Sequence, residues 1–176
     1  MKHFDYRKHI RLPEFDYSNP GIYFVTICSY KKKHTFGKTL DGQIELSALG
    51  EIVNKNWFKI PDHVYGFQSI EFCVMPNHIH GLIELNENNN SILGSIIGSY
   101  KSSVTREYNN RRSEACLAAT KVWQPNYYEH VVRNENAFDW ITEYIRMNPE
   151  NWTMDEENRH ASKSNPFYHW LNTYWK

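Results

Sequence analysis

The chain of 176 residues lacks the features that mark several protein classes. It has three cysteines, Cys28, Cys73 and Cys116, and their odd number and wide separation argue against a disulfide framework and a zinc knuckle. No hydrophobic run approaches the roughly 18 residues that a membrane span requires, and the charged N-terminal residues lack the apolar segment of a signal peptide. We therefore expect a cytoplasmic protein with reduced cysteines and no membrane contact.

An excess of either charge is also absent, because the formal net charge is zero. The distribution is uneven: basic residues predominate from Met1 to Lys38 and acidic residues from Glu135 to Asn158. Such polarity suits a protein that places one face on a phosphate backbone, although solvated charged faces of this size are as common. The length fits one domain. We assign the whole chain, 1–176, to it, with a core at about 20–152, an N-terminal arm at 1–19 and a C-terminal tail at 153–176.

Hydrophobic periodicity and turn residues predict an alternation of strands and helices. The order is strand, helix, strand, strand, helix, strand, helix, at residues 21–30, 47–58, 67–75, 78–85, 91–112, 122–133 and 137–148, with a further short strand at 43–46. This order predicts an α+β, ferredoxin-like (split β-α-β) sandwich, in which two helices cover one face of a central antiparallel sheet. A third, C-terminal helix can then lie across the other face. The polar and aromatic residues beyond 151 show no clear periodicity.

His78 and His80 stand two positions apart in the predicted strand at 78–85. Side chains alternate between the faces of a strand, so both imidazoles project from one face, while Ile79 points into the opposite layer. Two neutral nitrogen ligands side by side can bind one divalent cation. A half-exposed strand face is the alternative, because a pair of histidines at this spacing also occurs by chance.

The last predicted helix carries Tyr144 and Asn148 one turn apart, on the same stripe as Trp140. If this helix crosses the face that bears the histidines, Tyr144 supplies an oxygen nucleophile and Asn148 a third metal ligand. An amide oxygen favours Mg²⁺ or Mn²⁺ over zinc. With twelve tyrosines in the chain, most of which must be packing residues, periodicity alone does not select Tyr144.

Three ordered motifs make the chain resemble a known family. They are Val74-Met75-Pro76-Asn77-His78-Ile79-His80-Gly81-Leu82-Ile83, the segment from Val122 to Asn134, and Glu143-Tyr144-Ile145-Arg146-Met147-Asn148-Pro149. Together they resemble the REP-associated tyrosine transposases, members of the single-tyrosine HUH superfamily.

The resemblance implies a metal-dependent enzyme that cleaves and rejoins single-stranded DNA, often beside a hairpin, through a 5′-phosphotyrosine intermediate. It implies that His78, His80 and Asn148 hold the metal, Mg²⁺ or Mn²⁺, and that Tyr144 is the nucleophile. A covalent intermediate conserves the bond energy, so strands can be rejoined without ATP. Relatives act as monomers or as homodimers, and both states stay open. Other candidate nucleophiles are Tyr108, Tyr127 and Tyr128.

Further residues have weaker assignments. His130, in the second motif, can position the phosphate or the tyrosine, or be a packed histidine. Lys101, Arg106 and Arg133 are candidate phosphate contacts, which position DNA without reading its sequence. The acidic stretch Asp155-Glu156-Glu157 is interpreted as solvated surface, with a regulatory tail as the alternative.

Two other functions fit the same fold. One is a non-catalytic nucleic-acid-binding module, since ferredoxin-like sheets also form RNA-recognition domains, although the chain lacks their sequence signature. The other is a metallonuclease that uses water, with Tyr144 only orienting it. A close approach of the Tyr144 oxygen to the two imidazoles is the geometric expectation that separates the transposase from both.

Overall fold

The computed structural model describes residues 17, 19–112, 120–162 and 165–174. In this part of the chain the strands are β1 Gly21–Cys28, β2 Gly37–Leu40, β3 Gln43–Leu46, β4 Phe67–Val74, β5 His78–Leu85 and β6 Tyr128–Val132. Four of them form an antiparallel sheet in the order β4-β5-β1-β6, while β2 and β3 form a separate hairpin. The histidine strand β5 is therefore an interior strand, as predicted.

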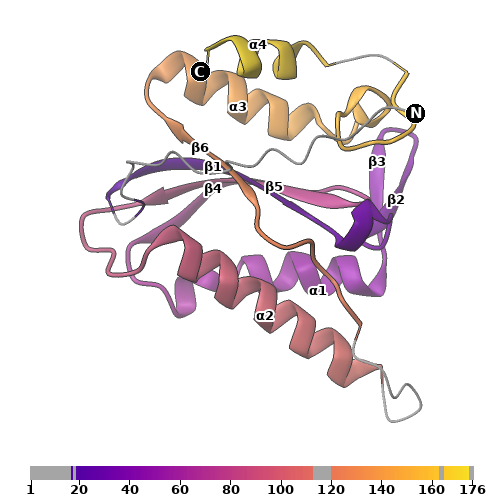
Figure 1. The fold of residues 1–176 in the computed structure, drawn as a ribbon, viewed down its shortest axis with the longest axis horizontal. Coiled ribbons are helices and arrows are strands. Elements are labelled where there is room, and N and C mark those ends of the chain that lie inside the picture. The colour runs from indigo at the N-terminus through magenta and orange to yellow at the C-terminus, as the bar shows by residue number, and fades with distance from the viewer. Residues whose placement is uncertain (1–16, 18, 113–119, 163–164, 175–176) are drawn as a thin grey trace.

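Helices cover both faces of this sheet (Figure 1). The described α-helices are α1 Ala48–Trp57, α2 Leu93–Arg111, α3 Glu135–Met147 and α4 Pro166–Tyr174. Helices α1 and α2 lie on one face, whereas α3 and α4 lie on the other (Figure 1). The predicted α+β fold with an antiparallel central sheet is confirmed, and α4 is an addition to it, because no periodicity indicated a helix beyond residue 151.

Local capping explains where two of the predicted helices begin. The Ser47 hydroxyl accepts a hydrogen bond from the Gly50 amide at the start of α1, and the Asn134 side chain accepts one from the Ala137 amide at the start of α3. Helix α2 begins two residues later than predicted. Ser91 does not cap it, because its hydroxyl donates to the side chain of Asn90 instead.

Two apolar clusters fill the spaces on either side of the sheet. The larger cluster joins the sheet to α1 and α2 and includes Ile79, which points away from the histidine face as predicted. The smaller cluster joins the other sheet face to α3 and α4 and includes Phe24, Leu82 and Tyr144. The sheet therefore separates the main core from a second layer that contains the candidate site.

Some predictions lie wholly or largely outside the described residues: the N-terminal arm at 1–19 and the segment between α2 and residue 120. Three 3₁₀ helices complete the described elements, at Tyr30–Lys32, Ile60–Asp62 and Trp152–Met154. Within the described chain, no helix combines the length and apolar character needed to cross a membrane.

Candidate active site

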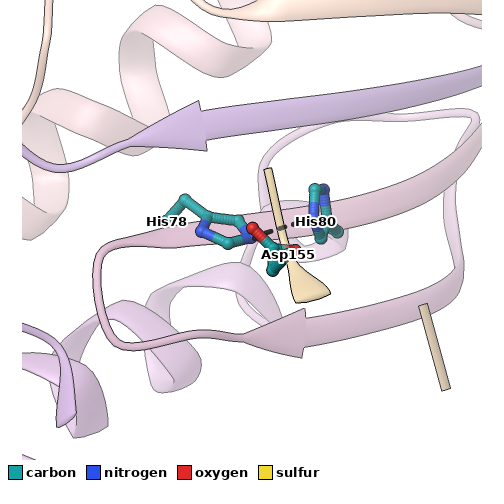
Figure 2. Close-up of side chains that lie close together, drawn as sticks. All are labelled: His78, His80 and Asp155. Atoms are coloured by element: carbon teal, nitrogen blue, oxygen red, sulfur yellow. Dashed lines mark hydrogen bonds and ion pairs between the residues drawn. The ribbon is translucent and has the colours of Figure 1, made fainter. Parts of the chain in front are cut away.

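The site is centred on the two histidines of β5. Both side chains are fully buried, and the Nε2 atoms of His78 and His80 lie 2.9 Å apart (Figure 2). The sheet sets this approach, because side chains two residues apart project from one face of a strand. The predicted pairing of the imidazoles on one face is therefore present in the structure.

Each imidazole is held at its other nitrogen by an oxygen. Asn77 Oδ1 lies 2.8 Å from His78 Nδ1, and Thr26 Oγ1 lies 2.8 Å from His80 Nδ1. The Asn77 amide donates its N–H to the Glu157 carbonyl at 2.8 Å, which fixes its orientation and leaves its oxygen to accept from His78. His78 is thus protonated on Nδ1, and its Nε2 lone pair faces the site. Metal-binding histidines usually have this arrangement, in which the second ring nitrogen donates its hydrogen to a neighbouring oxygen.

Asp155 adds a carboxylate to the pair. It follows the 3₁₀ helix Trp152–Met154, is 1% exposed, and its Oδ2 lies 3.8 Å from His78 Nε2 (Figure 2). Its Oδ1 accepts the backbone N–H of Glu157 at 2.7 Å, which orients the group. The donor atoms of His78, His80 and Asp155 all lie within 4.8 Å of one another.

This donor set fits a divalent cation. Two adjacent ligands of an octahedral Mg²⁺, each about 2.1 Å from the ion, lie about 3 Å apart, close to the 2.9 Å between the two Nε2 atoms. Burial lowers the pKa of His78 to about 4 and that of His80 well below its usual value, the latter also through His78. Both rings are therefore neutral at pH 7, the form that binds metal.

Tyr144 of α3 brings its phenol oxygen to the histidines. This oxygen lies 3.1 Å from His80 Nε2, 3.1 Å from Asp155 Oδ2 and 2.6 Å from the Tyr168 oxygen. Its ring stacks on Phe167 of α4, with centroids 3.7 Å apart. Burial raises the pKa of Tyr144 well above its usual value, and Tyr168 and Asp155 add to the shift. The phenol is therefore protonated at neutral pH, with a carboxylate oxygen available to accept its proton.

Asn148, one turn after Tyr144, is 1% exposed, and neither polar atom of its amide has a hydrogen-bond partner among the described residues. A buried amide without a partner costs about 1–3 kcal/mol, so a ligand that engaged it would recover that free energy. Trp140, on the same predicted stripe, is half exposed.

The remaining candidates lie at different distances from this centre. His130 is on the site face of β6, where its ring stacks on Phe24, which in turn stacks on His80. Lys101 donates to the carbonyl oxygens of Gln124 and Asn126, at 2.7 and 2.9 Å. Arg106 on α2 and Arg133 after β6 are exposed.

The other candidate tyrosines are less well placed than Tyr144. Tyr108 and Tyr127 pack into the cluster on the α1 and α2 side of the sheet. Tyr128 pairs with Thr26 across β1 and β6, which puts it on the site face. The Tyr144 oxygen, in contrast, lies within hydrogen-bond distance of His80 Nε2.

Residues 22–148 match the family model described as "Transposase IS200 like". The chain belongs to the IS200-like transposase family. The match contains the two histidines, Tyr144 and Asn148, and it ends before Asp155 and Tyr168. Members of the family generally use a divalent metal.

Relatives of this transposase agree with the assignment. An uncharacterised protein of Haemophilus influenzae is 34% identical over 171 residues, covering 86% of this chain and 92% of that protein. A second protein of that organism, named as a candidate REP-associated tyrosine transposase, is 24% identical over 143 residues, 76% of this chain and 73% of its own length. A solved structure of a REP-associated tyrosine transposase bound to a REP hairpin has a TM-score of 0.60 at 18% identity, covering 79% of this chain and 72% of that one.

The chain is thus a transposase of the REP-associated tyrosine type, and such proteins are DNA-cleaving enzymes. The alternative of a non-catalytic nucleic-acid-binding module is therefore wrong. At 18% identity the solved structure supports the fold, and the bound hairpin is a ligand of that protein.

The sequence interpretation of the transposase's acidic stretch as solvated surface was right for Glu156, which is exposed, and wrong for its two neighbours. Asp155 and Glu157 are buried, at 1% and 9% exposure, and are not solvated surface. Glu157 accepts from the Cys28 thiol and pairs with Lys32, so it ties the segment to β1. Asp155 and Tyr168 were not predicted as site residues, because they follow the recognised motifs and no spacing links either of them to the histidines.

The site of the transposase is closed in this structure. The two histidines are 0% exposed, Asn148 is 1% exposed and Tyr144 is 5% exposed. The Trp152 ring packs against His78, and Phe167 and Tyr168 of α4 pack against Tyr144.

Proposed function

We propose that this transposase cleaves and rejoins single-stranded DNA through a phosphotyrosine formed on Tyr144, at sites beside a hairpin, with Mg²⁺ or Mn²⁺ as cofactor. The observation that carries the proposal is the 3.1 Å distance between the Tyr144 oxygen and His80 Nε2. This distance supports the proposal because it brings a phenol oxygen of the same chain next to a buried pair of neutral imidazoles. The similar fold of a REP-associated tyrosine transposase that binds a REP hairpin supports the choice of DNA.

His78, His80 and Asp155 would hold the cation, with the Asn148 amide oxygen as a further donor. The cation would offset the phosphodiester charge that repels a phenolate and would polarise phosphorus. The Tyr144 oxygen then bonds to phosphorus while the bond to the 3′ oxygen breaks, leaving a 5′-phosphotyrosine and a 3′-hydroxyl. Asp155 Oδ2, 3.1 Å away, already accepts the Tyr144 hydrogen bond and would take the phenol proton, and the departing 3′ oxygen would take up a proton to become the hydroxyl.

Single-stranded DNA with a hairpin, labelled at its 3′ end, incubated with Mn²⁺ and resolved by denaturing electrophoresis, tests this proposal. We expect a covalent protein–DNA band that does not form when chelator is present from the start. Tyr144→Phe should keep DNA binding and abolish the band, because phenylalanine retains the ring and loses the nucleophilic oxygen. Tyr168→Phe is the matched control, since it removes the neighbouring phenol and should keep the band.

Two other outcomes would support a different reaction or a different nucleophile. Fragments without a covalent band would support a water-using metallonuclease. A covalent band in Tyr144→Phe would assign the nucleophile to another tyrosine, first to Tyr168 or Tyr128, which share this face of the sheet.

A further inference from the structure

A groove of about 480 Å³ lies between α1 and α2, away from the catalytic centre. The sheet separates the two sites, because α1 and α2 cover one face and the histidines project from the other (Figure 1). One wall continues from the end of α1 into Lys59 and His63, and the other is α2 from Ile96 to Arg111. Nothing in the chemistry of Tyr144 uses this groove.

The groove carries positive charge that no described residue neutralises. Lys59 and Arg106 line it, are exposed, and have no side-chain hydrogen bond or ion pair with the described residues. The one carboxylate in its lining, Glu107, is already engaged: it binds Lys55, Asn56 and Arg111. The Asn56 hydrogen bond is the main cause that lowers the pKa of Glu107, to about 2, so this carboxylate is charged at neutral pH, and its partners among the described residues do not include Lys59 or Arg106.

The rest of the lining suits a sugar–phosphate chain. Ser99 and Ser103 offer hydroxyls one turn apart on α2, whereas the two isoleucines of the lining, Ile60 and Ile96, are buried and belong to the core. Cations and hydroxyl groups contact phosphate oxygens. The chain has no net charge, so a local pair of unneutralised cations is a property of this groove and not of an overall basic surface.

We propose that this groove binds the phosphodiester backbone of the DNA substrate, with Lys59 and Arg106 each contacting a phosphate. The proposal rests on the proposed function for the identity of the ligand. It adds a second contact region, on the helix layer opposite the tyrosine, so the bound DNA passes the edge of the sheet. DNA can bind in this groove even when the buried catalytic centre does not admit it.

The salt dependence of DNA binding tests the groove. Each lost phosphate contact lowers the slope of log Kd against log salt by about 0.7 for a single strand and about 0.9 for a duplex. Lys59→Gln and Arg106→Gln should each show this loss, with Kd about four- to sixfold weaker at 0.15 M salt. The double variant should be roughly 14- to 30-fold weaker. Both residues are exposed, so the fold should persist.

Fluorescence anisotropy with labelled DNA provides the measurement. The probes are an unstructured oligonucleotide and a blunt hairpin, whose different slopes tell whether strand or stem occupies the groove. Lys38→Gln is the matched control, because it removes one exposed lysine charge from the β2–β3 hairpin. An unchanged slope in the double variant, or an equal loss in Lys38→Gln, would overturn the proposal.

The two proposals fail separately. A missing covalent band with a normal loss of slope would reject the Tyr144 chemistry and keep the groove. A covalent band with no loss of slope would keep the Tyr144 chemistry and reject the groove.

Discussion

Thr26 and Asn77 determine the orientation of the two imidazoles and which ring nitrogen of each faces the site. Each oxygen lies 2.8 Å from an Nδ1 atom, and the Nε2 atoms then face each other at 2.9 Å. The Asn77 amide can only accept from His78, whereas the Thr26 hydroxyl can either donate to His80 or accept from it. A cation at Nε2 requires the second arrangement, so Thr26 adjusts its hydrogen to the state of the site.

Thr26→Val removes this hydroxyl while keeping the shape of the side chain. We expect the affinity for Mn²⁺ to fall about 10- to 100-fold, the usual effect of losing an outer-shell partner. Isothermal titration with Mn²⁺ measures it. Thr105→Val is the control, because its hydroxyl donates to the Lys101 carbonyl on α2, on the other side of the sheet. Equal affinity in Thr26→Val and wild type would show that Thr26 does not orient His80.

Strand β5 packs against α1 through a glycine. A Cβ on Gly81 would lie 2.4 Å from two ring carbons of Trp57, whose indole is fully buried and donates to Ser69. The residue after the histidines is therefore glycine because the helix layer leaves no space for a side chain. A side chain at this position would therefore push β5 and α1 apart.

Gly81→Ala should destabilise the protein by about 1–3 kcal/mol, the usual cost of overpacking a core. Gly98→Ala is the matched control: no atom lies within 4 Å of its added Cβ, and it sits inside α2. Alanine there should stabilise the protein by about 0.5–1 kcal/mol, since glycine is a poor helix former. Urea unfolding measures both changes. A loss of stability in Gly98→Ala as large as in Gly81→Ala would contradict the packing argument.

The elements differ in how well their sequences predict them. The period of two in a strand predicted the common face of His78 and His80, and helical spacing predicted α3 with Tyr144 and Asn148 on one stripe. Both signals are local, because they reflect burial along one element. Helix α4 has nine residues, four of them aromatic, and aromatic residues are weak helix formers, so its contacts with Tyr144 and not its propensity stabilise it. Asp155 reaches the site through the path of the chain, which no spacing encodes.

At the scale of the whole molecule, the sheet separates two helix layers that have different roles. The layer of α1 and α2 contains the larger apolar cluster and the basic groove, while the layer of α3 and α4 encloses the histidines and the tyrosine. Enclosing the site removes titratable groups from water. Folding stability therefore depends on the charge state of the active site.

The metal-free protein should lose stability below pH 6.5. Unfolded histidine takes up a proton near pH 6.5, whereas burial lowers the folded pKa of His78 to about 4. Between these values the unfolded state binds more protons, so the free energy of unfolding falls as pH falls, by about 2 kcal/mol from pH 7 to pH 5 for His78 alone. Urea unfolding in chelator, followed by tryptophan fluorescence, measures the slope. His78→Asn should reduce the slope, and His63→Gln, at an exposed position, should leave it unchanged. Equal slopes in wild type and His78→Asn would show that the buried imidazole does not control acid stability.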